Sequence, residues 1–378
     1  MAGISIKDIK PTYEGSIFTM IFALLFIVTN LYMIDYKSMQ SLIESQDPFM
    51  ILILFAILVF LSKNSVIDLN KYRVSFLVLW GLYVATITLS MLMKDHFVWS
   101  EMLIWLMLTA VLMYRVPSRL VTYLIIAALF SLPALLMIDH TLNESGATLV
   151  FVFTAGLLLM PKKNAYMLFY MLPAFIMLNI ITTSRTAMAA FIAVVLIQLA
   201  WINLSGASRT QKKWFAGVVG GLVAITLVVF FHPIYEFFIG HYAINKGFTL
   251  NTFTSGRYVL WETIWAKKEW FGQGHGYFDF TELLHAHNIF FDTLGRYGIL
   301  AALLFVLVLG AACVIALARR NFGILLYFAI FIFIGLFEYN YLFMFVYFSP
   351  IVLLFVLMAY LLTFREDMSD VRATESGK

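Results

Sequence analysis

The chain has 378 residues, of which 62% are hydrophobic and 12% are charged, and its mean hydropathy is +0.92. Soluble domains carry about a quarter charged residues, so this chain has too few to cover a water-facing surface. The apolar residues form unbroken blocks, which excludes a disordered chain and an outer-membrane barrel. A single cysteine, Cys313, excludes an internal disulfide. The composition therefore predicts an all-α, polytopic membrane protein.

Twelve apolar segments approach or exceed the length of about 20 residues that a membrane-spanning helix needs. Charged or turn-forming residues separate them. The second and sixth segments are short enough to be re-entrant or buried instead. The predicted spans are 16–34, 48–62, 74–93, 98–114, 118–138, 147–160, 164–183, 186–203, 214–231, 288–318, 322–338 and 341–363.

Basic residues cluster in alternate connections between these spans. If the N-terminus is inside, the inner segments hold 17 of the 25 Lys and Arg residues. Positive charge resists translocation, so both termini are expected in the cytoplasm, and the first apolar block is expected to span the membrane without being cleaved. The net charge of +4 then serves orientation, with no sign of a nucleic-acid patch. The 17 residues are Lys7, Lys10, Lys63, Lys71, Arg73, Arg115, Arg119, Lys162, Lys163, Arg209, Lys212, Lys213, Arg319, Arg320, Arg365, Arg372 and Lys378.

One connection, residues 232–286, is much longer than the others and falls on the outer face. Long loops are usually functional, so this loop is expected to carry the chemistry. The expected organisation is nine spans in residues 1–231, an extracytoplasmic catalytic loop in 232–286, and three spans with a cytoplasmic tail in 287–378.

Within this loop, residues 254–270 predict an amphipathic helix with Thr254 or Ser255 as its N-cap. A helix lying at the membrane interface explains the Trp and Lys residues on its face, including Trp265. Arg257 falls at the helix N-terminus, where the N–H groups already attract anions, and so indicates an anion site. On sequence grounds the two interpretations are evenly balanced.

A glycine-rich segment follows, with Gly272, Gly274 and Gly276 alternating. It imitates a nucleotide-binding loop, but no strand precedes it and no crossover helix follows. We therefore expect a tight turn that returns the chain to the membrane.

Two histidines, His285 and His287, come next, at the start of the tenth span. No cluster of Cys or carboxylate residues with ligand spacing accompanies them, so a metal site is a weak interpretation. A mostly neutral imidazole at the edge of a low-dielectric site is suited to accept a proton from a hydroxyl group.

Further into that span, Asp292 and Arg296 are one helical turn apart. A buried pair at this spacing neutralises itself, so we expect it to stabilise the helix rather than to react. Gly295 and Gly298 are expected to let a neighbouring helix approach closely.

A third charged feature, Arg185, lies at the middle of about 40 otherwise uncharged residues. The position predicts a tight outer turn or the first turn of the eighth span. An arginine near membrane depth costs about 2.5–3.5 kcal/mol on insertion scales, and no acidic residue is close in sequence. An anionic ligand would offset that cost, which favours a functional role.

Together, these features resemble the O-antigen polymerase and O-antigen ligase family over residues 180–305. This sequence departs from the family pattern at Ala301, where the last glycine of a Gly-x-x-Gly motif is expected. The motifs are Ser-Arg-Thr at 184–186, Ser-Gly-Arg at 255–257, and His-Asn at 287–288 followed after nine residues by Gly298.

The resemblance implies a GT-C-like glycosyltransferase that uses undecaprenyl-diphosphate-linked sugars at the outer face of the bacterial cytoplasmic membrane. It needs no metal and no cofactor. Arg185 and Arg257 would bind the diphosphate and stabilise its developing charge. His287 would take the proton from the attacking sugar hydroxyl in an inverting displacement.

Several further residues are candidates for binding the substrate. The aromatic ones suit sugar stacking, although anchoring at the membrane interface explains them equally well. The candidates are Tyr258, Trp261, Lys268, Tyr277, His285 and Asn288.

The favoured function is a polymerase that joins lipid-linked repeat units of O-antigen, capsule or exopolysaccharide. A flippase and a chain-length regulator are the protein partners that such a role implies, with no nucleic acid. The first alternative is a ligase that transfers finished polysaccharide to a lipid A core, although Ala301 weakens that match. A twelve-helix transporter is less favoured, because transporters usually have their long connection between two similar halves.

Overall fold

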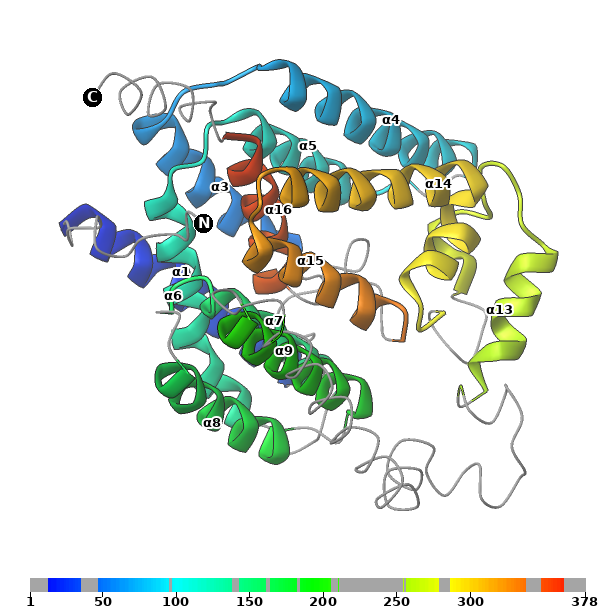
Figure 1. The fold of residues 1–378 in the computed structure, drawn as a ribbon. Coiled ribbons are helices and arrows are strands. Elements are labelled where there is room, and N and C mark those ends of the chain that lie inside the picture. The colour runs from blue at the N-terminus through cyan, green and yellow to red at the C-terminus, as the bar shows by residue number, and fades with distance from the viewer. Residues whose placement is uncertain are drawn as a thin grey trace, which may run out of the picture.

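The structure is a computed structural model. It describes residues 13–34, 47–94, 97–137, 143–160, 164–181, 184–204, 210, 254, 256–278, 286–337 and 348–363. Within these residues the fold is all-helical, as predicted, and the helices pack into a bundle (Figure 1). The helices are α1 (Tyr13–Ile34), α3 (Asp47–Asn64), α4 (Lys71–Met93), α5 (Trp99–Met113), α6 (Ser118–Ser131), η2 (Leu132–Met137), α7 (Asn143–Gly156), α8 (Asn164–Ile181), α9 (Arg185–Leu204), α13 (Arg257–Ala266), η3 (His275–Phe278), α14 (Ile289–Ala318), α15 (Phe322–Gly335) and α16 (Phe348–Thr363).

Helices occupy eleven of the twelve predicted spans, and the remaining span, 214–231, lies outside the described residues. Among the described residues, five stretches are long and apolar enough to cross a membrane: α1, α3, α4, α14, and α6 continued by η2. The other apolar helices are shorter in the part of the chain that the structure describes. A multi-pass membrane protein agrees with these lengths and with the composition.

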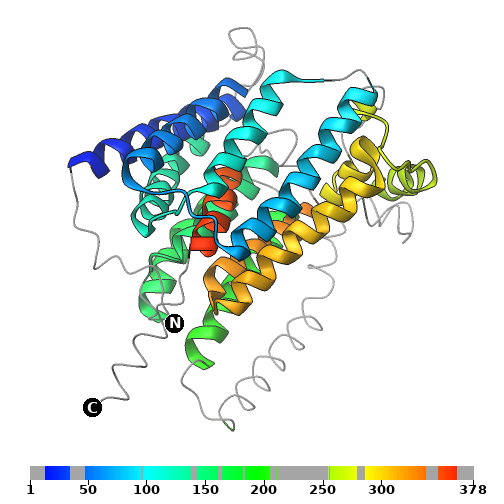
Figure 2. The same ribbon diagram turned by 90° about the horizontal axis from the view of Figure 1, so that it is seen from above.

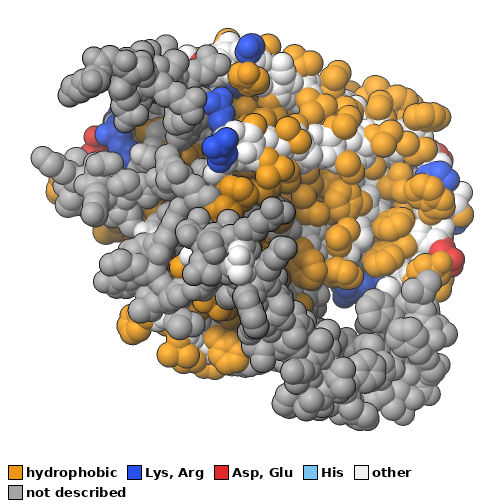
Figure 3. All heavy atoms as spheres, in the orientation of Figure 1, with side chains coloured by type: hydrophobic (Ala, Val, Ile, Leu, Met, Phe, Trp, Pro, Cys, Tyr) orange, Lys and Arg blue, Asp and Glu red, His pale blue; other side chains and the backbone are white. Residues whose placement is uncertain are grey.

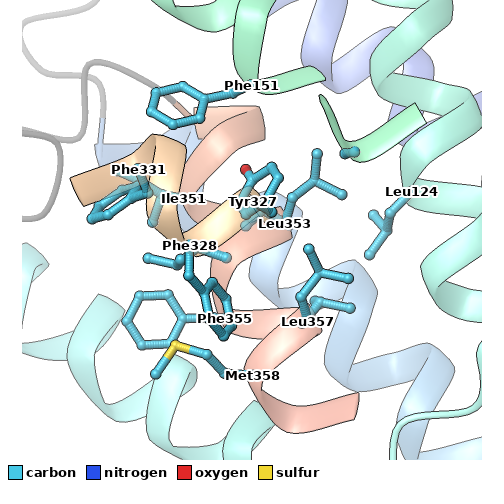
Figure 4. Packing of buried hydrophobic residues seen from close by; sticks show 14 of the residues in the cluster. Leu124, Phe151, Tyr327, Phe328, Phe331, Ile351, Leu353, Phe355, Leu357 and Met358 are labelled. Atoms are coloured by element: carbon cyan, nitrogen blue, oxygen red, sulfur yellow. The ribbon is translucent and has the colours of Figure 1, made fainter. Parts of the chain in front are cut away.

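The centre of the bundle is formed by helices that are mostly apolar and are buried on all sides. Every described side chain of α7 is buried, and so is nearly every one of α16. A helix that is hydrophobic all round is stable only inside a protein or a membrane. Figure 4 shows Phe151 of α7 near Phe331 and Tyr327 of α15, at ring-centroid distances of 5.8 and 5.9 Å. The short sixth predicted span, now α7, is therefore a buried helix.

The outer surface is apolar as well. Helices α4 and α14 lie side by side in two perpendicular views (Figures 1 and 2). Hydrophobic side chains cover their visible face, and most charged ones lie toward the helix ends (Figure 3). Leu82 of α4 and Leu303 of α14 are each 54% exposed. An apolar surface of this extent is typical of lipid contact.

One basic residue of the predicted cytoplasmic set is part of the core. Arg73, in the first turn of α4, is fully buried. Its guanidinium donates to the carbonyl oxygen of Tyr114, to the Ala359 carbonyl oxygen at 3.3 Å and to the Thr363 hydroxyl at 2.9 Å. Buried charge is retained where hydrogen bonds satisfy it, so Arg73 joins the ends of α4, α5 and α16.

Three of the described helices have an asparagine as their N-cap residue. Asn70 accepts from the Arg73 N–H at 3.0 Å at the start of α4, and Asn321 accepts from the Ile324 N–H at 3.2 Å at the start of α15. Asn288 caps α14 in the same way. Asparagine is among the best N-cap residues because its side-chain oxygen satisfies N–H groups that have no partner within the helix.

Candidate active site

Helix α14 is interrupted at Gly298, where φ is 88° and ψ is −177°. The short segment before this break leaves the direction of the long segment after it (Figure 1). A break of this kind leaves backbone N–H and C=O groups on both sides without hydrogen-bond partners inside the helix. Where these groups are buried, they need other hydrogen-bond partners.

The glycine-rich turn supplies those partners. It is a turn, as predicted, and it docks onto the break in α14 through its own backbone. Ser90 of α4 adds a hydrogen bond to the Arg296 carbonyl oxygen at 3.3 Å. The four backbone bonds run from Gln273 N to Gly295 O at 3.0 Å, Gly274 N to Arg296 O at 2.8 Å, Ile299 N to Glu269 O at 2.9 Å, and Leu300 N to Trp270 O at 3.3 Å.

Glycine is required on both sides of this contact. Gly272 has φ of 69°, and a Cβ atom there would lie 2.4 Å from the Arg296 carbonyl oxygen. A Cβ atom on Gly298 would lie 2.3 Å from the Gly272 nitrogen, and one on Gly295 would lie 2.8 Å from the Tyr277 ring. Gly295 and Gly298 were expected to admit a neighbouring helix. The 3-10 helix η3 does approach Gly295, whereas the glycine-rich turn, and not a helix, approaches Gly298.

The docked turn holds the first segment of α14 against the loop helix α13. A small apolar cluster, separate from the main core, lies between them. Long loops often cover satellite clusters of this kind. Its buried members are Ile264, Phe278, Ala286 and Leu294, with Leu260, Trp261, Tyr277, Phe291, Ile299 and Ala302 packed around them.

Helix α13 confirms a helix within the predicted loop, but its N-cap differs from the prediction. The N-cap is Gly256, with φ of 88°, whereas Thr254 or Ser255 was expected. Because Gly256 adopts the left-handed conformation, the helix starts at Arg257, one or two residues later than expected. The Thr254 hydroxyl still accepts a hydrogen bond from the Tyr258 N–H at 3.0 Å. Ser255 lies outside the described residues.

His287 lies just before α14, half-buried, with φ of 50°. Few residues other than glycine adopt this backbone conformation, so it marks a constrained position. The following residue, Asn288, accepts hydrogen bonds from the N–H groups of Phe290 at 2.9 Å and Phe291 at 3.1 Å. The N-cap thus fixes where α14 begins relative to the histidine.

The C-terminal end of α15 meets the starts of both α13 and α14. Arg257 donates from Nη1 to the Phe337 carbonyl oxygen, and Asn288 donates from Nδ2 to the Leu336 carbonyl oxygen at 3.0 Å. The two helix N-termini carry partial positive charge, which adds to the charge of the arginine in favouring an anion, whereas the carbonyl groups at the end of α15 oppose it. The structure thus brings together Arg257, His287 and Asn288.

The charge state of His287 reflects this environment. Burial, and next the positive charge of Arg257, lower the pKa of its imidazole from 6.5 to about 4. Both causes disfavour the protonated form. At pH 7 the side chain is therefore neutral and able to accept a proton.

The Asp292–Arg296 pair is buried and bonded, as predicted. Arg296 Nε lies 3.0 Å from Asp292 Oδ1, and both side chains are at most 1% exposed. The Arg296 guanidinium also lies 5.0 Å from the centre of the Phe278 ring. These contacts attach the first segment of α14 to η3, which agrees with a stabilising role.

The predicted aromatic and lysine residues take up different positions. Trp261 turns inward and donates from Nε1 to the Ala286 carbonyl oxygen at 2.7 Å. Interaction with Glu262 on the same helix raises the pKa of the Tyr258 phenol. Tyr277 packs on α14, and its partial burial raises the pKa of its phenol.

Lys268 lies beyond the C-terminal end of α13, at the opposite end from Arg257. Its Nζ is 4.4 Å from the centre of the Trp265 ring, and Trp265 is 58% exposed. These contacts agree with the interfacial interpretation of this end of the helix.

Arg185 is the first residue of α9, which matches one of the two positions predicted for it. Ser184 is buried, and its hydroxyl accepts from the Ala187 N–H at 3.2 Å, which caps the helix. Helix α9 packs against α15, and the Phe337 carbonyl just after α15 accepts a hydrogen bond from Arg257. The Arg185 side chain and the whole of His285 lie outside the described parts of the structure.

The roles of the Leu336 and Phe337 carbonyl groups could not be predicted from the sequence, because every residue has a main-chain oxygen and its type does not mark it. Also missed was the pairing of Gly272 with Gly298, for which the two glycine motifs were the available signal. Across the described ranges, no group of three or more His, Cys, Asp or Glu side chains is placed to hold a metal ion.

The candidate site lies within a segment of the chain that matches a known protein family. Residues 167–306 match a family model described as O-antigen ligase. The matched segment includes Arg185, Arg257 and His287, and it confirms the family resemblance over that part of the chain. The match covers less than half of the chain, and over that segment the chain is similar to O-antigen ligases. No curated protein matches the sequence.

Proposed function

We propose that this chain, similar to the O-antigen ligase family over residues 167–306, is a polysaccharide polymerase. It joins undecaprenyl-diphosphate-linked repeat units at the outer face of the bacterial cytoplasmic membrane. The observation that carries the proposal is the geometry at the end of α15. Arg257 and Asn288, the neighbour of His287, bond to the consecutive carbonyls of Phe337 and Leu336, so a histidine and an arginine lie close together. A base beside an anion-binding group is what transfer from a sugar diphosphate requires.

In the proposed reaction, a hydroxyl group of the acceptor sugar attacks the anomeric carbon of the donor. The new carbon–oxygen bond forms as the bond to the diphosphate breaks, and the diphosphate leaves with the electron pair. His287 takes the hydroxyl proton. Attack from the face opposite the leaving group inverts the anomeric configuration.

Arg257 is proposed to bind the diphosphate, with Arg185 as a second cation. A guanidinium has five N–H donors in a fork that matches a phosphate, so Arg257 is proposed to bond to a phosphate as well as to the Phe337 carbonyl. Developing charge on the leaving diphosphate is stabilised in the same position.

Donor binding also strengthens the base. The negative diphosphate offsets the field of Arg257 at His287, so the pKa of the imidazole rises from about 4 when the donor is bound. His287 then becomes a stronger base where the acceptor hydroxyl must lose its proton.

The remaining predicted roles belong to the same proposal. Tyr258, Tyr277 and Lys268 are candidate contacts to sugars or headgroups, and His285 is a candidate contact beside the base. A flippase and a chain-length regulator follow from the family resemblance alone. Both termini are proposed to be cytoplasmic, with the loop between 232 and 286 outside.

The test is to incubate purified protein with lipid-linked repeat units and to separate the products by length. A ladder of lengths supports the polymerase. A single transfer to added lipid A core, without a ladder, would instead identify a ligase. Movement of solute across vesicles with no new glycosidic bond would identify the transporter alternative.

A further inference from the structure

The backbone around His287 is held on both sides by side chains of other residues. With φ of 50°, His287 is one of two described non-glycine residues with positive φ. Such a conformation persists where the surrounding structure fixes it. The contacts of the two neighbouring residues, Ala286 and Asn288, therefore decide where the imidazole lies.

On the N-terminal side, Trp261 holds Ala286. The indole Nε1 donates to the Ala286 carbonyl oxygen at 2.7 Å, and Ala286 is fully buried. The Trp261 ring is also stacked on Phe291, with centroids 5.4 Å apart and planes within 2°. Because both the N–H and the ring face of Trp261 are engaged, its position is fixed from α13 and from α14 together.

On the C-terminal side, Asn288 links α14 to α15. The side chain is 5% exposed. Its Oδ1 accepts from two N–H groups at the start of α14, and its Nδ2 donates to Leu336 at the end of α15. Arg257 is bonded to the next carbonyl, that of Phe337, so the histidine and the arginine are located by the same turn.

We propose that Trp261 and Asn288 are positioning residues that hold His287 in its reactive place relative to Arg257, and that neither contacts the sugar. This role replaces the substrate contact that the sequence suggested for both residues. The inference rests on the proposed function, because it assigns His287 as the base.

The charged surroundings of His287 make its titration a sensitive measure of position. After burial itself, Arg257 on α13 is the charged group of the described residues that lowers the pKa of the imidazole. Leu336 and Phe337, at the end of α15, contribute carbonyl oxygens and no titratable side chain. We call the contacts of Trp261 and Asn288 the clamp. If the clamp is loosened, the imidazole becomes more hydrated and lies farther from Arg257, so its pKa moves up toward 6.5.

Two substitutions remove one hydrogen bond each and leave the other contacts. Trp261→Phe keeps an aromatic ring on Phe291 and removes the N–H. Asn288→Ser keeps an N-cap oxygen and removes the amide donor to Leu336. The matched controls are Trp265→Phe, one turn along α13, and Asn321→Ser at the N-cap of α15.

The expected result is a fall in kcat of about 10- to 100-fold for both variants, because small misplacements of reacting groups have effects of this size. The KM for the lipid-linked donor stays within about twofold, since positioning acts on the reacting geometry rather than on binding. The acid limb of the kcat/KM profile moves to higher pH. Both controls behave as the wild type.

A rise in donor KM with unchanged kcat would overturn the inference and identify a substrate contact. Unchanged kcat and an unchanged acid limb would overturn it as well. If Trp261→Phe does not fold, β-(3-benzothienyl)alanine at the same position keeps the shape of the indole without its N–H, and the same outcomes apply.

The reactivity of His287 with diethyl pyrocarbonate as a function of pH separates this inference from the proposed function. An upward pKa shift in both variants supports the clamp even if the wild type makes no glycosidic bond. An unchanged titration overturns the clamp while leaving a measured transferase activity intact.

Discussion

At the residue scale, the candidate chemistry depends on the charge of one imidazole. His287 has its pKa lowered to about 4 by burial and by Arg257. The neutral form is therefore present throughout the physiological range, and protonation occurs only in acid. The acid limb of kcat/KM reports the pKa of the unliganded enzyme, whereas that of kcat reports the complex.

A pH profile tests this charge state. We predict that kcat/KM falls as the pH drops through about 4, the pKa of His287. The corresponding limb of kcat lies at higher pH, because the bound diphosphate favours the imidazolium. A kcat/KM limb at the ordinary histidine value of about 6.5 would contradict the account.

Removing the positive neighbour should move the same limb. In Arg257→Gln the imidazolium loses a repulsive charge, so the His287 pKa rises and the acid limb of kcat/KM shifts to higher pH. The shift covers part of the distance to 6.5, because burial is the larger cause of the lowered value. Lys267→Gln, an exposed lysine on the same loop, is the control, and equal profiles for the two variants would disprove the coupling.

The second proposed arginine can be tested by keeping its charge and changing its shape. We expect Arg185→Lys to lose about 10-fold or more in kcat/KM, because an ammonium cannot make the two-pronged contact of a guanidinium with a phosphate. Arg119→Lys on α6 is the matched control. Full activity in Arg185→Lys would show that a general positive charge is enough.

At this scale, the residues that could be predicted from the sequence are those marked by their type and by their position in a motif. His287 was found by its motif and its position at the start of a span, and Arg257 by its motif and its position at a helix N-terminus. The roles of Trp261 and Asn288 could not be found that way. Each acts through a bond to a main-chain oxygen, which only the folded chain brings within reach.

At the element scale, the break in α14 and the turn docked on it form one unit. The break places the first segment of α14 beside α13, and the turn replaces the hydrogen bonds that the break removes. Apolar periodicity predicted one continuous helix here, because a single left-handed glycine does not interrupt the hydrophobic pattern. Gly298 stood out as part of a motif, but not as a break.

Replacing one glycine of this unit should disrupt it. We predict that Gly272→Ala lowers the free energy of unfolding of the protein and abolishes most glycosyl transfer. At Gly272 φ is 69°, and a Cβ atom would lie 2.4 Å from the Arg296 carbonyl oxygen. Backbone strain of this kind costs about 1–3 kcal/mol, to which the collision adds. Thermal unfolding and transfer rates measure both effects.

Gly310 on the same helix is a matched control. A Cβ atom there meets nothing within 4 Å. Gly310→Ala should therefore retain activity and gain about 0.5–1 kcal/mol, the usual difference between alanine and glycine inside a helix. If Gly272→Ala were equally harmless, the docked turn would not support the site.

At the scale of the whole molecule, composition and block length were sufficient to predict an all-α membrane protein. They also predicted the positions of the helices closely, from α1 to α16. The packing order could not be predicted, because lipid-facing and buried side chains are equally apolar in α4 and α16. Arg73 shows the same limit: its charge suggested a cytoplasmic loop, whereas it is buried in the bundle.

The proposed orientation can be tested with a cysteine-reactive probe that does not cross membranes. With Cys313 replaced by Ala, Glu262→Cys on α13 should be labelled in intact spheroplasts, because the loop is proposed to face outward. Lys63→Cys at the end of α3 should be labelled only after the membrane is opened. The reverse pattern would contradict the topology inferred from the basic residues.

The most direct test of the central claim compares His287→Ala with the wild type in the purified polymerisation assay. The account predicts a ladder of product lengths for the wild type. It predicts none for His287→Ala, although this variant still folds and binds the lipid-linked donor. A normal ladder from folded His287→Ala protein would contradict the assignment of the base, and with it the proposed site.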